Sequence, residues 1–338
     1  MISNGMKNFW RELRKPILCL APMADVTDCA FRQIIAKYGK PDIFWTEFVS
    51  ADGLAHPVAK EKLLVDLKYS ENERPIVAQI FGGKPENIKN AAALCKKLGF
   101  DGIDINMGCP DKSIEKQCAG AGMMKNPKLA REIIRAAIEG ADGLPVSVKT
   151  RIGYNGHALD EEWIKILLQE NIAALTVHLR TRKEMSDVPA HWELMKRIVE
   201  IRDEMKSETL ILGNGNVVDT DDGRRKCEET GCDGVMLGRA IFGNPFLFAN
   251  KNVLSEVEGL SLDSTRDKTT AEKLEAMVLH TKLFEKMLGG HKNFAIMKKH
   301  YKAYCNGFEG AKELRMKLME TENAEQVEKT VNDFLNKK

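Results

Sequence analysis

The segment Asp-Ile-Asn-Met-Gly-Cys-Pro at residues 104–110 joins a buried apolar run to a turn that carries the thiol of Cys109. Residues 102–105 are typical of a buried β-strand, and the Gly-Cys-Pro sequence that follows predicts a turn at the strand end. A thiol held there serves as a nucleophile, an acid or a metal ligand, or it only packs. The eight cysteines include no C-x-x-C pair, so the sequence predicts no metal site.

Polar or conformationally special residues follow most of the other apolar runs. They are Met23, Gln79, Asn106, Lys149 with Arg151, His178 with Arg180, Asn214, and Gly238 with Arg239. A single residue of this kind is weak evidence, because polar side chains at strand ends are often merely solvated. Active sites of parallel barrels lie at the carboxyl ends of the strands, so many such ends together predict an active site.

Two glycine-containing loops indicate a phosphate-bearing ligand. Residues 213–216 read Gly-Asn-Gly-Asn after the seventh apolar run, and residues 238–240 read Gly-Arg-Ala after the eighth. Glycines there let backbone N–H groups approach an anion, and Arg239 adds positive charge. Either loop alone could be an ordinary turn. Both together favour a phosphate ligand, with FMN and a sugar phosphate as the candidates.

Lys149 and Gln79 suit a flavin. A lysine on the fifth strand is expected near the barrel axis, where it would stabilise the anionic reduced form at the flavin N1–C2 edge. A Schiff-base lysine and an ion pair are the alternatives. The Gln79 amide matches the pyrimidine edge of the isoalloxazine ring, and the alternative is a polar residue that fills a layer of the barrel.

Eight short apolar runs alternate with amphipathic helices. The runs are 17–21, 43–48, 75–80, 102–105, 145–149, 174–178, 210–213 and 233–237, and helices are expected near 27–38, 85–98, 127–139, 160–169, 191–203 and 220–230. Short strands buried on both faces predict a parallel sheet, and eight of them predict a (β/α)8 TIM barrel. A doubly wound sheet is the competing architecture, but residues 21–25 contain no G-x-G-x-x-G turn.

The strand pattern stops near residue 250. A polar linker is expected over 251–271, followed to residue 338 by helices broken at Gly289-Gly290 and Asn306-Gly307. The sequence therefore predicts a catalytic barrel over 1–250 and a helical bundle over 251–338. Residues 282–317 carry nine basic and three acidic side chains, a net charge of +6.

Bulk properties narrow the class of protein. The net charge of +2 over 338 residues identifies no partner, and no apolar run approaches the ~18 residues of a membrane span. Residues 1–16 lack the apolar core of a signal peptide. A cytoplasmic protein that does not bind membranes is expected, as a monomer with no obligate protein partner.

Six motifs in order resemble those of the tRNA-dihydrouridine synthases, from Ile17 to about Phe248. They are Ala-Pro-Met at 21–23, Gln-Ile-Phe-Gly at 79–82, Asn-Met-Gly-Cys-Pro at 106–110, Val-Lys-Thr-Arg at 148–151, His-Leu-Arg-Thr-Arg at 178–182 and Gly-Arg at 238–239. The cysteine motif is the most specific, since Ala-Pro-Met and Gly-Arg also occur in other FMN barrels. The tail resembles the family's helical RNA-binding domain through residues 297–301 and 314–315.

The resemblance implies that tightly bound FMN, reduced by NADPH, saturates the C5–C6 bond of a uridine in tRNA. Hydride would reach C6, and Cys109 would protonate C5. The implied cofactor-binding residues are Pro22, Met23, Ala24, Gln79, Lys149, His178, Asn214, Gly215, Asn216, Gly238 and Arg239. The implied substrate-binding residues are Asn106, Arg151, Arg180, Arg182, Lys298, Lys299 and Arg315. Reaching the barrel requires the uridine to be flipped out of the RNA, and the basic segment 282–317 would hold the RNA backbone.

The sequence departs from the family pattern at Leu179, over 183–192, and at Asn216. Cys118, nine residues after Cys109, is interpreted as a packing thiol, and the alternative is that it competes with Cys109 as the reactive one. Two alternatives stay open, an FMN-barrel reductase of a free pyrimidine or enoyl substrate and a non-catalytic RNA-binding barrel. The basic tail argues against the first, because a small-molecule reductase needs no such surface. Cys109, Lys149 and the two phosphate loops together argue against the second.

Overall fold

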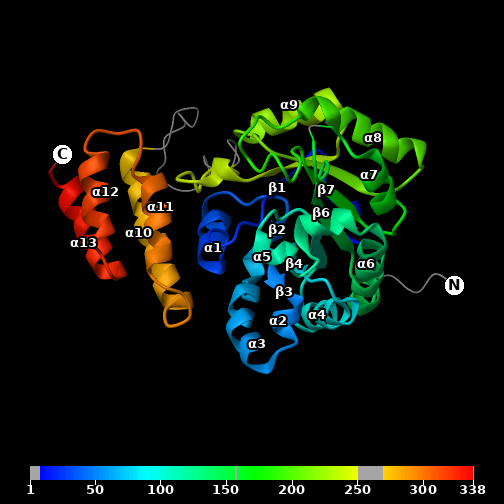
Figure 1. The fold of residues 1–338 in the computed structure, drawn as a ribbon. Helices are drawn as coiled ribbons and strands as arrows, with labels where there is room; N and C mark the ends of the chain where they lie inside the picture. The colour runs from blue at the N-terminus through cyan, green and yellow to red at the C-terminus, as the bar shows by residue number, and fades with distance from the viewer. Residues whose placement is uncertain (1–7, 157, 250–268, 338) are drawn as a thin grey trace. The chain divides into compact units, whose positions relative to one another are not determined.

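The computed structural model describes residues 8–156, 158–249 and 269–337. Nine strands form one parallel sheet in the order β1-β9-β8-β7-β6-β5-β4-β2, and β3 pairs with β4. The strands are β1 (Ile17–Leu20), β2 (Phe44–Trp45), β3 (Val49–Ser50), β4 (Ile76–Phe81), β5 (Gly102–Asn106), β6 (Val146–Arg151), β7 (Ala174–His178), β8 (Leu210–Asn214) and β9 (Gly234–Leu237). A parallel bridge between Cys19 and Ile43 joins β1 to β2, so the predicted (β/α)8 barrel is confirmed (Figure 1).

The helices connect the strands, and most of them begin at capping side chains. They are α1 (Cys29–Tyr38), α2 (Ala51–Leu54), α3 (Pro57–Leu63), α4 (Pro85–Lys97), α5 (Lys112–Glu115), α6 (Pro127–Ala141), α7 (Glu161–Leu168), α8 (Met195–Glu204) and α9 (Thr220–Thr230). The exceptions are α4 and α8. Asp28, Asp160 and Asp219 each accept the backbone N–H three residues further along the chain. These carboxylates satisfy donors that have no partner inside the helix, which fixes where α1, α7 and α9 start.

Packing at the amino end of the barrel closes its interior. Trp10, from the 3-10 turn Phe9–Arg11, is buried, and its ring lies 5.9 Å from that of Trp45 on β2. β4 is buried at every position. Large apolar side chains therefore fill this end, and polar side chains are collected at the other.

The second strand is shorter than the sequence predicts. Its ladder stops after Trp45 because the hydroxyl of Thr46 accepts the backbone N–H of Gln79, at 3.1 Å. The chain then turns and pairs again with β4 through β3. The helices α2 and α3 were not predicted, although Ser50 caps the first and Pro57 opens the second.

Contacts divide the chain into two compact units. The first comprises residues 1–23, 42–69 and 74–238, and the second comprises 24–41, 70–73 and 239–338. The barrel strands lie in the first. The second holds α1, which is blue in Figure 1, and four helices drawn from yellow-orange to red. These four are α10 (Thr270–Leu288), α11 (Ala295–Tyr304), α12 (Ala311–Met319) and α13 (Ala324–Leu335).

The predicted helical tail is confirmed, because α10 ends before Gly289-Gly290 and α11 before Asn306-Gly307. The predicted domain boundary at 250–251 and most of the linker over 251–271 fall outside the described residues. None of the described helices is long and apolar enough to cross a membrane.

Two buried histidines lie at the centre of the second unit. The His280 ring stacks on Phe31 at 4.8 Å and meets the His300 ring edge-on at 4.6 Å. Within the described residues, neither ring nitrogen of His280 has a hydrogen-bond partner, and neither does Nε2 of His300. Burial lowers the pKa of both side chains, that of His300 to about 3, and Lys299 lowers the latter further.

We expect acid to destabilise this unit. An unfolded histidine takes up a proton near pH 6.5, whereas these two stay neutral when folded, so stability is lost as the pH falls below about 6.5. His280→Phe removes one unpaired imidazole and should raise the free energy of unfolding at pH 5 by about 2 kcal/mol more than at pH 8. Denaturant unfolding at the two pH values measures this difference. The exposed His291, changed to Gln, is the control, and an unaltered pH dependence in His280→Phe would contradict the account.

Candidate active site

The carboxyl-terminal halves of β4 to β8 carry six of the predicted site residues, Gln79, Asn106, Lys149, Arg151, His178 and Asn214. Gln79 pairs with Asp104, and Asp104 pairs with Ser147. Residues in register on neighbouring strands point to the same face of a sheet. Further along, the pairs are Asn106 with Lys149, Arg151 with His178, and His178 with Asn214. All of them belong to the first unit, so the structure brings these side chains together.

A chain of hydrogen bonds leads from the barrel interior to the turn that carries Cys109. The Gln79 Nε2 donates to Asp104 Oδ2 at 2.7 Å, and the Asn106 Nδ2 donates to Gln79 Oε1 at 3.2 Å. Asn106 Oδ1 accepts the backbone N–H groups of Gly108 and Cys109, at 3.1 and 3.0 Å. In this structure Asn106 therefore holds the turn, and its contact with a substrate stays a prediction.

Cys109 is partly buried at the end of this turn. Burial raises the pKa of its thiol, while the backbone N–H of Asp111 and the charges of Arg151 and Lys149 pull that pKa back. The thiol is thus protonated at neutral pH, and it is poised to give up a proton and not to act as a thiolate.

Lys149 lies beside the same end of the barrel. Its Nζ donates to Asn214 Oδ1 at 3.2 Å, and the Asn214 Nδ2 donates to the carbonyl of Met236 at 2.7 Å. Loss of water around the ammonium lowers the pKa of Lys149 to about 8, with Arg151 acting in the same direction and Asp104 opposing. At neutral pH the side chain is therefore mostly cationic. This favours an anion-holding role over a Schiff base, which needs a neutral amine.

The loop after β8 offers backbone donors to an anion. Gly215 and Asn216 both adopt left-handed conformations, with φ values of 120° and 51°. Within the described residues neither backbone N–H has an acceptor. A Cβ at position 215 would lie 3.1 Å from the ring of His178, so glycine is required. Successive free N–H groups of this kind bind phosphate oxygens.

Arg180 is buried and joins the loops after β7 and β8. Its Nε donates to the carbonyl of Val188 at 2.6 Å, its Nη2 donates to Asn216 Oδ1, and its Nη1 lies 2.9 Å from His178 Nε2. A guanidinium only donates, so Nε2 of His178 must accept, which leaves the imidazole neutral. The predicted contact of Arg180 with RNA stays untested.

Arg151 ties the Cys109 turn to the segment after β7. Its Nε donates to the carbonyl of Gly108 at 2.8 Å, and its Nη1 donates to the carbonyls of Thr181 and Met185, at 3.0 and 2.7 Å. Arg151 thus links the Cys109 turn to the segment 183–192, whose sequence departs from the family pattern.

Arg182 makes a second connection between the same two segments. It pairs with both carboxylate oxygens of Glu115 on α5, at 2.7 and 2.6 Å. A further nitrogen contact joins it to the carbonyl of Pro110, at 3.3 Å. The bidentate pair lowers the pKa of Glu115, chiefly through hydrogen bonding. Arg182 is therefore paired within the protein, although its residue type suggested contact with RNA.

Five predicted residues belong to the second unit, which is described separately from the cluster. They are Ala24, Arg239, Lys298, Lys299 and Arg315. Lys299 Nζ pairs with Asp25 at 3.0 Å within that unit. In the first unit, Pro22 and Met23 follow β1, and a Cβ at Gly238 would lie 3.8 Å from the Met23 sulfur. Of the two loops predicted to bind phosphate, residues 213–216 and Gly238 thus belong to the first unit and Arg239 to the second.

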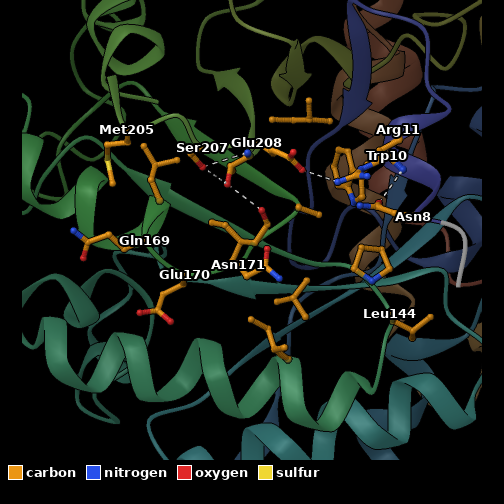
Figure 2. Close-up of a pocket in the computed structure, with 18 of the residues that line it drawn as sticks. Asn8, Trp10, Arg11, Leu144, Gln169, Glu170, Asn171, Met205, Ser207 and Glu208 are labelled. Atoms are coloured by element: carbon orange, nitrogen blue, oxygen red, sulfur yellow. Dashed lines mark hydrogen bonds and ion pairs between the residues drawn. The ribbon is translucent and has the colours of Figure 1, made fainter. Parts of the chain in front are cut away.

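A hollow of about 880 Å³ lies at the opposite, amino end of the barrel (Figure 2). Gln169, Glu170 and Asn171 reach it from the turn before β7, and Ser207 and Glu208 reach it from the turn before β8. None of the predicted site residues lines it. Barrel enzymes place their chemistry at the carboxyl ends of the strands, so we assign the site to the Cys109 cluster and not to this hollow.

Three residues near the site were not singled out from the sequence: Asp104, Ser147 and Glu115. Asp104 precedes Asn106 by two positions, so strand periodicity places both side chains on one face and could have revealed it. Glu115 carries no comparable signal, because its partner lies far away in the sequence. The interpretation of Cys118 as a packing thiol is wrong, since its side chain is exposed at a positive φ of 53°.

The thiol of Cys109, the ammonium of Lys149 and the glycine loop after β8 lie at the carboxyl ends of the parallel strands, where (β/α)8-barrel enzymes place their chemistry. The family model described as dihydrouridine synthase matches residues 19–338. The Bacillus subtilis strain 168 protein named "Probable tRNA-dihydrouridine synthase 2" is 40% identical over 329 residues, covering 97% of each chain. A Staphylococcus aureus strain COL protein named "Probable tRNA-dihydrouridine synthase" is 41% identical, covering 97% of this chain and 96% of its own. The chain belongs to the dihydrouridine synthase family.

Solved structures resemble the chain in fold alone. The old yellow enzyme homologue from Zymomonas mobilis aligns with a TM-score of 0.50 at 13% identity, over 72% of this chain and 89% of its own. Histamine dehydrogenase from Rhizobium sp. 4-9 aligns with a TM-score of 0.51 at 12% identity, over 83% and 50%. Both support the barrel architecture.

Proposed function

We propose that the protein reduces the C5–C6 double bond of a uridine in tRNA to 5,6-dihydrouridine, with FMN as its cofactor and NADPH as the reductant. The activity follows from family membership over nearly the whole chain. The single structural observation that carries the proposal is the turn of Cys109, whose backbone N–H is held by Asn106 at the end of the barrel that bears Lys149.

The residues at the carboxyl end fit a flavin mononucleotide. Backbone N–H groups of Gly215 and Asn216 lack acceptors within the described residues and suit its phosphate. Lys149 suits the edge of the ring that becomes anionic, and Gln79 suits the pyrimidine edge. Bound FMN, once reduced by NADPH, would supply the hydride that adds to C6. Pro22, Met23, Ala24, His178, Asn214, Gly238 and Arg239 complete the proposed cofactor site.

Cys109 would donate the proton that C5 requires when C6 receives hydride. The two additions together supply one hydride and one proton, which saturate the double bond and leave Cys109 as a thiolate. Solvent then reprotonates it. Burial keeps the acid form dominant beforehand, and Arg151 and Lys149 stabilise the thiolate afterwards.

The helical region 251–338 is proposed to bind tRNA. Its described part carries Lys298, Lys299 and Arg315, whose charges suit the phosphate backbone. Arg151, Arg180 and Arg182 are proposed to act near the flipped uridine. We propose that the protein acts in the cytoplasm, as a monomer.

Two measurements on the purified protein test this proposal against a small-molecule reductase and a non-catalytic barrel. The absorbance spectrum should show flavin bands. NADPH-dependent product should form from unmodified tRNA and not from free uridine or uridine monophosphate. Turnover of the free nucleosides at the tRNA rate would favour a small-molecule reductase. A protein that takes up no flavin when FMN is added would favour the RNA-binding barrel.

Breaking the Glu115–Arg182 pair should impair the reaction without removing its acid. Glu115→Gln weakens the contact that steadies the segment following Cys109, so we expect kcat to fall about tenfold while flavin affinity is kept. Steady-state kinetics and flavin titration measure the two quantities. Glu193, an exposed acidic residue, changed to Gln is the control. A kcat equal to that of the control would show that the pair does not position the thiol.

A further inference from the structure

Asp104 is a buried carboxyl in the middle of β5 that the proposed chemistry leaves without a role. It is 1% exposed and lies among polar partners from both neighbouring strands. Ser147 Oγ on β6 lies 2.5 Å from one carboxyl oxygen, and Gln79 Nε2 on β4 lies 2.7 Å from the other. A buried carboxyl costs free energy unless it is bonded in this way, so its presence calls for an explanation.

The carboxylate imposes a direction on the hydrogen bonds above it. It only accepts, so Gln79 must turn its NH2 group toward Asp104 and its oxygen toward Asn106. That oxygen also only accepts, so Asn106 must present its own NH2 group to Gln79. The Asn106 oxygen is thereby left for the N–H groups of Gly108 and Cys109.

No other arrangement satisfies this chain. If the Gln79 amide alone were reversed, its NH2 group would face the NH2 group of Asn106. If the Asn106 amide were reversed as well, its NH2 group would face the backbone N–H groups of Gly108 and Cys109. Either case leaves buried donors opposed and unpaired. The orientation of the two amides is therefore held from both ends, by the carboxylate of Asp104 below and by the N–H groups of Gly108 and Cys109 above.

We propose that Asp104 is a positioning residue of the reaction: its carboxylate anchors the Gln79 amide and, through it, the Asn106 amide that holds the turn presenting the Cys109 thiol. The inference rests on the proposed function only for its catalytic consequence. Burial raises the pKa of Asp104 to about 6, and the bonds from Ser147 and Gln79 limit that rise. The carboxylate is therefore the dominant form at neutral pH, as the argument requires.

Thiol alkylation tests the positioning directly and needs neither flavin nor tRNA. The exposed Cys118 would also react, so the parent is Cys118→Ser. In that background Asp104→Leu removes the acceptor at similar volume. The turn should loosen, so iodoacetamide should modify Cys109 about tenfold faster at pH 7.5, and the midpoint of its pH profile should fall toward ~8.5, the value of a free thiol.

Two further variants make the result decisive. Asp104→Asn keeps an oxygen but can present either its oxygen or its NH2 group to Gln79, so the alkylation rate of Cys109 should rise about threefold. This variant decides the test if Asp104→Leu does not fold. Thr209→Val removes a buried hydroxyl bonded to the carbonyl of Ile172 at the amino end of the barrel, and it should not change alkylation. Unchanged alkylation in the folded Asp104 variants would overturn the inference, and so would an equal rise in Thr209→Val.

Kinetics then separate this inference from the proposed function. If both hold, Asp104→Leu lowers kcat for tRNA about a hundredfold, as expected for a misplaced reacting group. If the parent does not reduce tRNA but alkylation responds, the proposed function fails and the positioning role stands. If tRNA is reduced and alkylation does not respond, the positioning role fails alone.

Discussion

Cys109→Ala is expected to abolish nearly all dihydrouridine formation, with turnover lowered by about 10²–10⁴-fold. The variant should still fold and hold its flavin, because Asn106 bonds the backbone N–H at position 109 and not the side chain. Alanine removes the donor for C5 and leaves the hydride step without a proton partner. The expected phenotype is thus a yellow, folded and almost inactive protein.

Cys118→Ala is the matched control, because it removes an exposed thiol nine residues away in the sequence. Its turnover of tRNA should equal that of the parent protein. Single-turnover mixing of the reduced variant with tRNA separates loss of chemistry from loss of binding. Undiminished product formation in Cys109→Ala would remove this thiol from the mechanism.

Lys149→Met is expected to have the second largest effect, lowering kcat by about 10²–10³-fold and weakening flavin binding about tenfold. The change removes a partly buried ammonium and leaves Asn214 Oδ1 without its donor. Flavin titration and anaerobic reduction by NADPH measure the two effects. If both match the parent protein, Lys149 is not the cation that the reduced cofactor requires.

The pH profile gives a further test of the same residue. The pKa of Lys149 is lowered to about 8, so the side chain is cationic below that pH and neutral above it. Turnover should therefore fall as the pH rises through about 8, while the thiol of Cys109, whose pKa is raised, is still protonated. Lys149→Arg keeps its charge throughout this range, and its residual activity should not show the decline.

The fold could be predicted because its signals are local. Most strands of the barrel are short runs buried on both faces, and helix-starting residues such as Asp160 and Asp219 lie where a cap is needed. The errors occurred where a side chain replaced the backbone. Thr46 accepts a bond that a strand carbonyl would otherwise take, which shortens β2 in a way that the apolar pattern does not reveal.

The residues of the candidate site could be predicted from their types and their positions at strand ends. Their hydrogen-bond partners could not. Lys149 and Cys109 lie at the ends of neighbouring strands, as their spacing indicated. Asn106 and Arg182 were predicted to contact the substrate, and in the structure they bond the Cys109 turn and Glu115. Such partners come together only through the register of the sheet and the folding of distant loops, neither of which a linear pattern encodes.

Nucleoside mass spectrometry of an unmodified tRNA transcript tests the central claim most directly. The transcript is incubated anaerobically with the flavin-loaded protein and NADPH, digested, and analysed for uridine that has gained two hydrogens. The account predicts dihydrouridine at a defined position with the wild-type protein and almost none with Cys109→Ala. A wild-type protein that oxidises NADPH, binds the transcript and leaves every uridine unchanged would contradict it.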